Sequence, residues 1–136
     1  MSDNIIAKAA ISDLNKTIEL DPMCADAYFS RGNAKKELQD YEGAITDLNY
    51  AIELDSNNAN AYLIRGIAKG RLYDYKAAIS DFTSAININP DEAGAYYNRG
   101  IARININRKD SGCLDFNKAK ELGYADADKA LKNFCR

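Results

Sequence analysis

The sequence predicts an all-α protein, built as a stack of antiparallel helix pairs. Three observations support this prediction. Arg-Gly steps recur every 34 residues, at Gly32, Gly66 and Gly100. An Ala-X-Ala-Tyr segment precedes each step, and a second apolar run follows it after a short break. A fixed period of roughly 20 to 50 residues indicates a repeat architecture, so we expect copies of one helical unit.

Each unit is expected to contain two helices joined by a tight turn. The complete units are 25–58, 59–92 and 93–126. Asp40 and Asp74 lie in the breaks, where their carboxylates can accept hydrogen bonds from the first amides of the second helix. Small and apolar residues in each second run are spaced three and four apart, so they share one helical face. They are Ala44, Leu48 and Ala51, then Ala78, Phe82 and Ala85, then Gly112, Phe116 and Ala119. Each helix should have about 13 residues.

The three periodic glycines predict close contact between the two helices of a unit. A glycine inside a helix is less favourable than alanine by about 1 kcal/mol. Three in register therefore indicate a steric reason: only a bare backbone lets the second helix approach. Ala44, Ala78 and Gly112 are the expected small residues on the facing helix.

Charged residues recur with the same period. The aspartates are Asp13, Asp47, Asp81 and Asp115, and the arginines are Arg31, Arg65 and Arg99. We expect a structural ladder of Arg–Asp pairs between adjacent helices, bidentate where the pairs are partly buried. The pattern leaves open whether each arginine meets the aspartate of its own unit or of the preceding one. The alternative is two independent rows exposed to solvent.

The two ends of the chain differ. Residues 5–24 match only the second half of a unit, with a helix expected from about Ile5 to Leu20 that leaves one face uncovered. Either the chain is a fragment of a longer array, which we favour, or this face forms a homodimer around a two-fold axis. Residues 125–136 carry apolar side chains at helical spacing, as expected of a C-terminal cap helix. They are Ala127, Ala130, Leu131 and Phe134.

Composition is that of an ordinary globular chain. The 136 residues are 46 % hydrophobic and 28 % charged, with a net charge of −2. The charges are interspersed, without the basic patch of a nucleic-acid binder, and no apolar stretch is long enough to span a bilayer. We therefore expect no nucleic acid and no membrane as partner. Residues 1–10 lack the pattern of a signal peptide. We expect a cytoplasmic location, unless the chain is part of a longer secreted or anchored protein.

Residue types argue against a metal site and against catalysis. The sequence has no histidine, and Cys24, Cys113 and Cys135 form no CxxC pair. We expect the three cysteines to be small apolar filler in a reducing compartment. No nucleophile motif or phosphate-binding glycine loop is present. The sequence therefore predicts no metal, no cofactor and no enzymatic activity.

The 34-residue pattern resembles the tetratricopeptide repeat, whose signature combines aromatic, Leu-Gly, Tyr, Ala, Phe and Pro positions. The resemblance covers nearly the whole chain and implies a single domain, 1–136, folded as a right-handed superhelical stack, an α-solenoid. Arginine replaces the family's leucine before each glycine. A basic residue replaces its tyrosine at Lys35, Lys69 and Arg103. These departures suggest a polar variant of the contact between paired helices.

The resemblance also implies a function. In this family the first helices line a concave groove that binds peptide or helical segments of other proteins, so we expect a non-catalytic scaffold or adaptor with a protein or peptide partner. Residues of the first helices that should face the groove are Phe29, Asn33, Lys36, Leu63, Ile67, Gly70, Tyr97, Asn98, Ile101 and Ile104. Their apolar content suits an apolar or amphipathic peptide. Some of them could instead cover the core. The alternative function is a structural module that self-assembles through its N-terminal half-repeat.

One subclass of the family clamps the acidic C-terminus of heat-shock chaperones with Lys, Asn and Arg side chains. Asn33 matches one member of that set. Other members are replaced by Phe29, Ile64, Gly94 and Asn98. We therefore do not expect this adaptor function.

Overall fold

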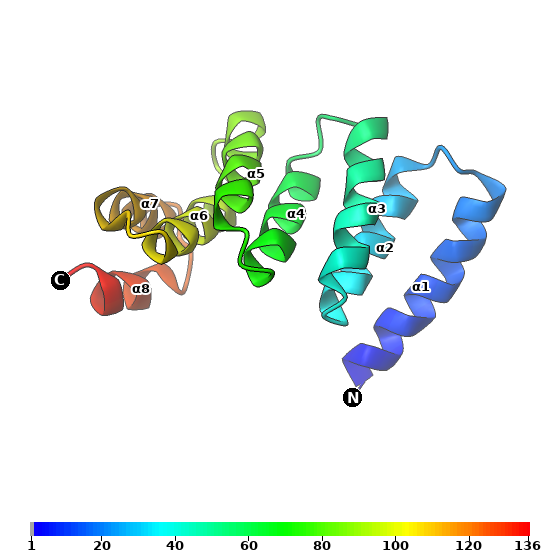
Figure 1. Cartoon of the computed structure of the whole chain (residues 1–136), viewed down its shortest axis with the longest axis horizontal. Coiled ribbons are helices and arrows are strands. Elements are labelled where there is room, and N and C mark those ends of the chain that lie inside the picture. Colours follow the sequence, from blue (N-terminus) through cyan, green and yellow to red (C-terminus); the bar gives the residue numbers. More distant parts are fainter. Residues whose placement is uncertain (1) are drawn as a thin grey trace.

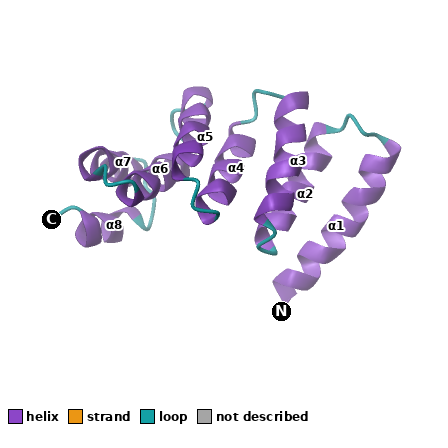
Figure 2. Cartoon of the chain, in the orientation of Figure 1, coloured by secondary structure: helices purple, strands orange, loops and turns teal. Residues whose placement is uncertain are grey.

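The computed structural model describes residues 2–136, and within this range every regular element is an α-helix (Figure 1, Figure 2). In chain order the helices are α1 (Ser2–Leu20), α2 (Ala25–Glu37), α3 (Tyr41–Leu54), α4 (Ala59–Arg71), α5 (Tyr75–Ile88), α6 (Ala93–Asn105), α7 (Lys109–Glu121) and α8 (Ala127–Phe134). The all-α prediction is confirmed, and the helices of the complete repeats have 13 or 14 residues.

The helices pack in the order of the chain. Helices α2 and α3, α4 and α5, and α6 and α7 form the closest pairs, and each pair stacks on the next. The first helices also touch one another, α2 against α4 and α4 against α6, so they share one side of the stack. The helix axes turn progressively along the chain: α3 is seen from the side in Figure 1, and α7 nearly along its axis. This is the predicted superhelical stack.

Aspartate caps begin two of the second helices. Asp40 Oδ1 accepts a hydrogen bond from the Gly43 amide at 3.0 Å, and Asp74 Oδ1 accepts one from the Ala77 amide at 3.4 Å. Each cap satisfies an amide that has no partner inside its own helix. The predicted roles of both aspartates are confirmed.

The turn inside each repeat depends on one left-handed residue. Gln39, Tyr73 and Asn107 have φ angles of 64°, 66° and 63°. This conformation lets the next amide bond back to the last turn, as between Asp74 N and Lys69 O at 2.9 Å. Glycine and asparagine adopt it most readily. A tyrosine at this position is locally unfavourable.

The periodic glycines have the steric role predicted for them. A Cβ atom at Gly32 would lie 2.9 Å from Leu48 Cγ. At Gly66 it would lie 2.6 Å from the Phe82 ring. The aromatic and leucine side chains of the second helices therefore occupy the space that any other residue would need. Leu48 and Phe82 are buried at the centre of their helix pairs.

Helix α1 is longer than the other second helices. It has 19 residues and begins at Ser2, before the expected Ile5. Its first residues are helical at positions where the complete repeats have the turn between their two helices. Ile5 and Ile6 lie on this extra turn and are each 65 % exposed. Within residues 2–136, no helix covers the face of α1 that corresponds to the contact between α2 and α3.

The other end is closed by α8, as the spacing of its apolar residues predicts. Ala127 and Ala130 are buried against the stack. The Phe134 ring stacks on the ring of Phe116, with centroids 6.1 Å apart. The cap therefore extends the core of the last repeat by one layer.

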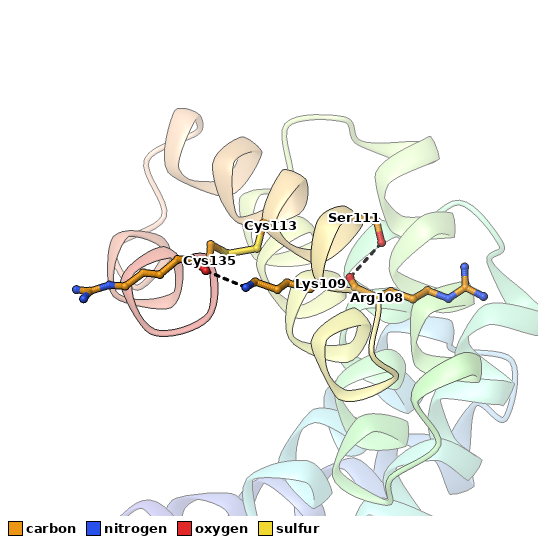
Figure 3. The surroundings of a disulfide bond; sticks show 6 residues. Arg108, Lys109, Ser111, Cys113 and Cys135 are labelled. Carbon is orange, nitrogen blue, oxygen red and sulfur yellow. Dashed lines mark hydrogen bonds between the residues drawn. A yellow bond between two sulfur atoms is a disulfide. The ribbon is translucent and has the colours of Figure 1, made fainter.

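A disulfide joins α7 to the end of the cap. Cys113 on α7 is bonded to Cys135, with Cα atoms 5.9 Å apart (Figure 3). Beside it, Lys109 Nζ donates a hydrogen bond to the Arg136 carbonyl oxygen at 2.9 Å. The expectation of three unpaired cysteines was therefore wrong for two of them, and only Cys24 is free among residues 2–136. Cys113 and Cys135, which are 22 residues apart in the sequence, lie close together because α8 folds back along α7. Disulfides of this kind are typical of oxidising compartments.

We predict that Cys135→Ser destabilises mainly the C-terminal end. The disulfide spans 22 residues, and a bond closing a loop of this size contributes about 3 kcal/mol. Because repeat stacks are stabilised by neighbour contacts, hydrogen exchange in α7 and α8 should accelerate while α2 to α5 keep their protection. Cys24→Ser is the matched control and should leave exchange unchanged. Equal acceleration along the whole chain in Cys135→Ser would contradict the prediction.

Candidate functional site

Each complete repeat contains a buried carboxylate held by two cations. Asp47 is 1 % exposed and accepts hydrogen bonds from Arg31 Nε at 2.8 Å and Arg31 Nη2 at 2.7 Å. Lys35 Nζ lies 3.0 Å from the same carboxylate. The hydrogen bond to Asp47 raises the pKa of Arg31. We call this arrangement the buried-aspartate clamp. It combines bidentate geometry with low solvent exposure, the conditions under which an ion pair is strong.

The clamp repeats with little variation. Asp81 is held by Arg65 at 2.7 Å and Lys69 at 3.1 Å. Asp115 is held by Arg99 and Arg103, both at 2.8 Å. The basic residues that depart from the family pattern are therefore the second cations of the clamps. Each carboxylate is fully occupied by structural partners.

Each clamp arginine also binds the preceding repeat. Arg31 Nη1 donates to Asn15 Oδ1 at 2.9 Å, and Arg65 Nη1 donates to Asn49 Oδ1 at 2.9 Å. Arg99 Nη1 donates to Thr83 Oγ1 at 3.2 Å. The question left open by the sequence is thus answered: the aspartate belongs to the arginine's own repeat, and the preceding repeat supplies an uncharged acceptor.

Asp13 does not belong to this ladder, contrary to the sequence prediction. It is exposed on α1 and has no ion pair within residues 2–136. The cations of a clamp come from the first helix of the same repeat. No such helix covers α1, so Asp13 keeps the register of the ladder without its partners.

The side of the stack formed by α2, α4 and α6 carries the predicted groove residues. All of them are half-buried. They are Phe29, Asn33 and Lys36 on α2, Leu63, Ile67 and Gly70 on α4, and Tyr97, Asn98, Ile101 and Ile104 on α6. Phe29 packs against the core around Ala44 and Leu48, and Leu63 and Ile67 pack against the core around Phe82. These three side chains therefore contribute to the core as well as to the surface.

Tyr97 lies toward the cap and is separate from the other candidates. Its ring stacks on Tyr124, with centroids 4.6 Å apart, and lies 5.7 Å from the Phe116 ring. Burial raises the pKa of Tyr97. It lines a small hollow with α8 residues such as Ala130 and Phe134. The sequence could not indicate this, because the position of α8 depends on how the chain folds back after Gly123.

A hollow of about 340 Å³ lies between α4 and α6. Four predicted groove residues, Ile67, Gly70, Asn98 and Ile101, line it together. Its other lining residues are Gly66, Arg71, Tyr73, Tyr75, Phe82, Ala102 and Asn105. We call it the α4–α6 pocket. Gly70 was among the sequence candidates, but Arg71, Tyr73, Tyr75 and Asn105 were missed because they lie at and beyond the helix ends.

Two smaller features extend this side toward α1. Lys36 and Ile67 line a hollow that also contains Tyr41 and Arg71. Asn33 lines another, formed with α1 residues including Leu14. The predicted residues therefore border a row of separate hollows between successive helices.

Two kinds of site are absent from the part of the chain that the structure describes. Among residues 2–136, no three histidine, cysteine, aspartate or glutamate side chains are grouped as a metal site would require. No helix in the same range combines the length and apolar character of a membrane span.

Comparison with known proteins identifies the repeat. A family model described as TPR repeat matches residues 32–72, and one described as tetratricopeptide repeat matches 59–92. A solved MamA protein is 30 % identical, with a TM-score of 0.80 over 90 % of this chain and 67 % of that chain. The chain is a tetratricopeptide repeat protein. The search of curated proteins found no match.

Other solved tetratricopeptide repeat domains share the fold. The Arabidopsis OM64 TPR domain is 28 % identical, with a TM-score of 0.80 over 82 % of this chain and 93 % of that one. The first TPR domain of Spaghetti (RPAP3), bound to the HSP90 peptide SRMEEVD, is 25 % identical, with a TM-score of 0.78 over 81 % and 89 %. Tetratricopeptide repeats serve generally as non-catalytic modules. Their presence makes this chain a protein-interaction scaffold.

We predict that Asp81→Ala destabilises the tetratricopeptide repeat fold by about 3 kcal/mol, because it leaves Arg65 and Lys69 without their buried partner. Chemical denaturation measures this loss. The matched control is Asp13→Ala, the same change in the same register but on an exposed residue, which should shift stability by less than about 0.5 kcal/mol. Equal effects of the two changes would show that the clamp does not stabilise the fold.

Proposed function

We propose that this protein binds an extended or helical segment of a partner protein along the side formed by α2, α4 and α6. The α4–α6 pocket is the observation that carries the proposal, because it brings four of the predicted groove residues to one hollow. Pockets that hold ligand groups are lined by apolar side chains with a few polar groups at fixed positions. Ile67 and Ile101 supply the apolar part here, and Asn98 the polar part.

Charge on this side favours an acidic segment. Lys36, Glu37 and Arg71 line the same hollow next to the α4–α6 pocket, two cations against one carboxylate. Lys36 lies 3.6 Å from Glu37, and Arg71 has no ion pair within residues 2–136. Opposite charge on a partner would therefore be attracted to this side. The RPAP3 domain is bound to a peptide with two glutamates and a terminal aspartate. The side chains with which the chaperone-binding subclass of the family holds an acidic C-terminus are largely replaced here, so we do not propose the same ligand.

The position of the buried carboxylates agrees with a scaffold role. Asp47, Asp81 and Asp115 each hold two cations and are buried. A carboxylate used for acid–base catalysis must reach a substrate. These three are fully engaged inside the stack and cannot do so.

We predict that Ile101→Glu weakens binding to an array of random 15-residue peptides at least tenfold, because it places a charge in the α4–α6 pocket. The control is Leu114→Glu, the same charge on α7, where Leu114 is 69 % exposed and lines no part of this pocket. Equal binding by the wild type and Ile101→Glu would contradict the proposal, as would a wild type that retains no peptide.

The second candidate function is self-association through α1, and a specific observation favours it. Ile5 and Ile6 are exposed on the extra first turn, and the face that other second helices pair with a first helix is uncovered. Contiguous exposed apolar surface indicates an interaction site. A second copy of the chain would present the same face, giving a two-fold dimer.

We predict that the protein dimerises at concentrations of a few hundred micromolar in sedimentation velocity, and that Ile5→Lys combined with Ile6→Lys makes it monomeric. Two added cations at a two-fold contact would repel their counterparts. Leu114→Lys, which alters a comparably exposed apolar residue on α7, should leave the dimer intact. A wild type that sediments as a monomer at these concentrations would exclude this second function.

A further inference from the structure

Gly70 differs from the periodic helical glycines in having no steric reason to be glycine. A Cβ atom at Gly70 would meet only Ala78 Cβ, at 3.9 Å, which is an ordinary contact. The corresponding residues of the other repeats carry long side chains, Lys36 and Ile104. Glycine is unfavourable in a helical turn compared with these residues. Packing of the stack therefore does not explain Gly70.

The turn next to Gly70 shows the opposite choice. Tyr73 occupies the left-handed position that favours glycine, with φ at 66°. Its side chain is 78 % exposed, so burial does not compensate for this conformation. The equivalent residue of the third repeat is Asn107, which suits the turn better. Within four residues, the chain has glycine where a side chain would fit and a tyrosine where glycine would fit.

Both unfavourable choices line the α4–α6 pocket. Gly70 leaves its wall open, and Tyr73 places an aromatic ring at its edge. Tyr75 lies beside Tyr73, with ring centroids 6.3 Å apart in an edge-on arrangement. Phe82 contributes a third ring. Departures from local preference are expected at functional sites, and three aromatic rings favour an aromatic occupant through edge and face contacts.

Polar groups at this pocket have a definite hydrogen-bonding capacity. Asn98 Nδ2 donates to the Gly94 carbonyl at 2.8 Å, and Asn105 Nδ2 donates to the Ile101 carbonyl at 2.9 Å. The amide oxygens of both asparagines thus remain to accept from a ligand, and amide N–H groups of an extended peptide can donate to them. Arg71, which forms no ion pair in the described part of the chain, adds a cation that suits a carboxylate.

We propose that the α4–α6 pocket is the specificity site of the proposed groove. Its occupant is an aromatic side chain of the bound segment, with a carboxylate on an adjacent residue that pairs with Arg71. This inference rests on the proposed peptide-binding function and names the chemistry of its ligand. It also gives a role to the glycine that the second repeat has at this position, where the first and third repeats have Lys36 and Ile104.

The test uses nine-residue peptides with a Gly-Ser background, a central Phe, Tyr, Leu or Ala, and Asp or Lys as the next residue. Fluorescence anisotropy of the labelled peptides measures binding. The wild-type chain should bind the Phe-Asp and Tyr-Asp peptides at least tenfold more tightly than the Ala-Asp or Phe-Lys peptides. Equal affinity for the Phe-Asp and Ala-Asp peptides would overturn the proposal.

Gly70→Met tests the pocket directly. Methionine is unbranched and flexible, and the first repeat already carries a long side chain opposite an alanine, so the variant should fold with unchanged or higher thermal stability. It should lose at least tenfold in affinity for the Phe-Asp peptide. Ser80→Met adds the same side chain to an exposed position of α5 and should bind as the wild type does. Tyr73→Asn, the residue of the third repeat, should weaken binding several-fold in a fold of equal or higher stability.

The outcomes separate this inference from the proposed function. If Gly70→Met keeps the wild-type affinity while Ile101→Glu loses it, the groove binds peptide but the pocket opened by Gly70 does not select the side chain, and the inference is wrong. If no peptide of either library binds the wild type, the groove function itself fails and the inference fails with it.

Discussion

The stack depends on a buried carboxylate shared between two cations. Asp47, Asp81 and Asp115 each accept a bidentate pair from arginine and a further contact from lysine or arginine. Removing two or three charges from water is unfavourable unless they satisfy one another. The arginine can reach its partner only because the glycine beside it lets the second helix approach. Charge pairing therefore depends on close packing of the two helices, and the Arg-Gly step in the sequence provides for both.

That constraint also connects the repeats. The third guanidinium nitrogen of each arginine is bound to the second helix of the preceding repeat. A single side chain thus holds its own helix pair together and sets its position on the previous pair. The arginine also lies over a tyrosine ring of its own helix, as with Arg65 and Tyr62 at 5.6 Å. The arginine that replaces the family's leucine thus also connects neighbouring repeats.

The ends of the stack are treated differently, and each reflects what its last helix lacks. At the C-terminus, α8 covers α7, and a disulfide fixes it there. At the N-terminus, α1 has the register of a second helix without its first helix, so Asp13 is exposed and the apolar residues of the extra turn face outward. The α4–α6 pocket shows a third departure from the repeat pattern, the combination of Gly70 and Tyr73. All three are places where the repeat pattern is broken, and the face of α1 and the α4–α6 pocket are where we locate the functions proposed for this protein.

The sequence by itself determined the repeat, the helix pairs, the aspartate caps, the glycine contacts and the two classes of end, because these depend on spacing along single helices or within one unit. It also named the residues of the clamp, although it placed Asp13 among them. Only the tertiary structure decided which aspartate each arginine meets, that Cys113 and Cys135 form a bond, that Tyr97 faces the cap, and that Arg71, Tyr73, Tyr75 and Asn105 join Gly70 at one pocket. These features depend on how helices from different repeats are placed against one another, and a 34-residue period carries no information about the residues that break it.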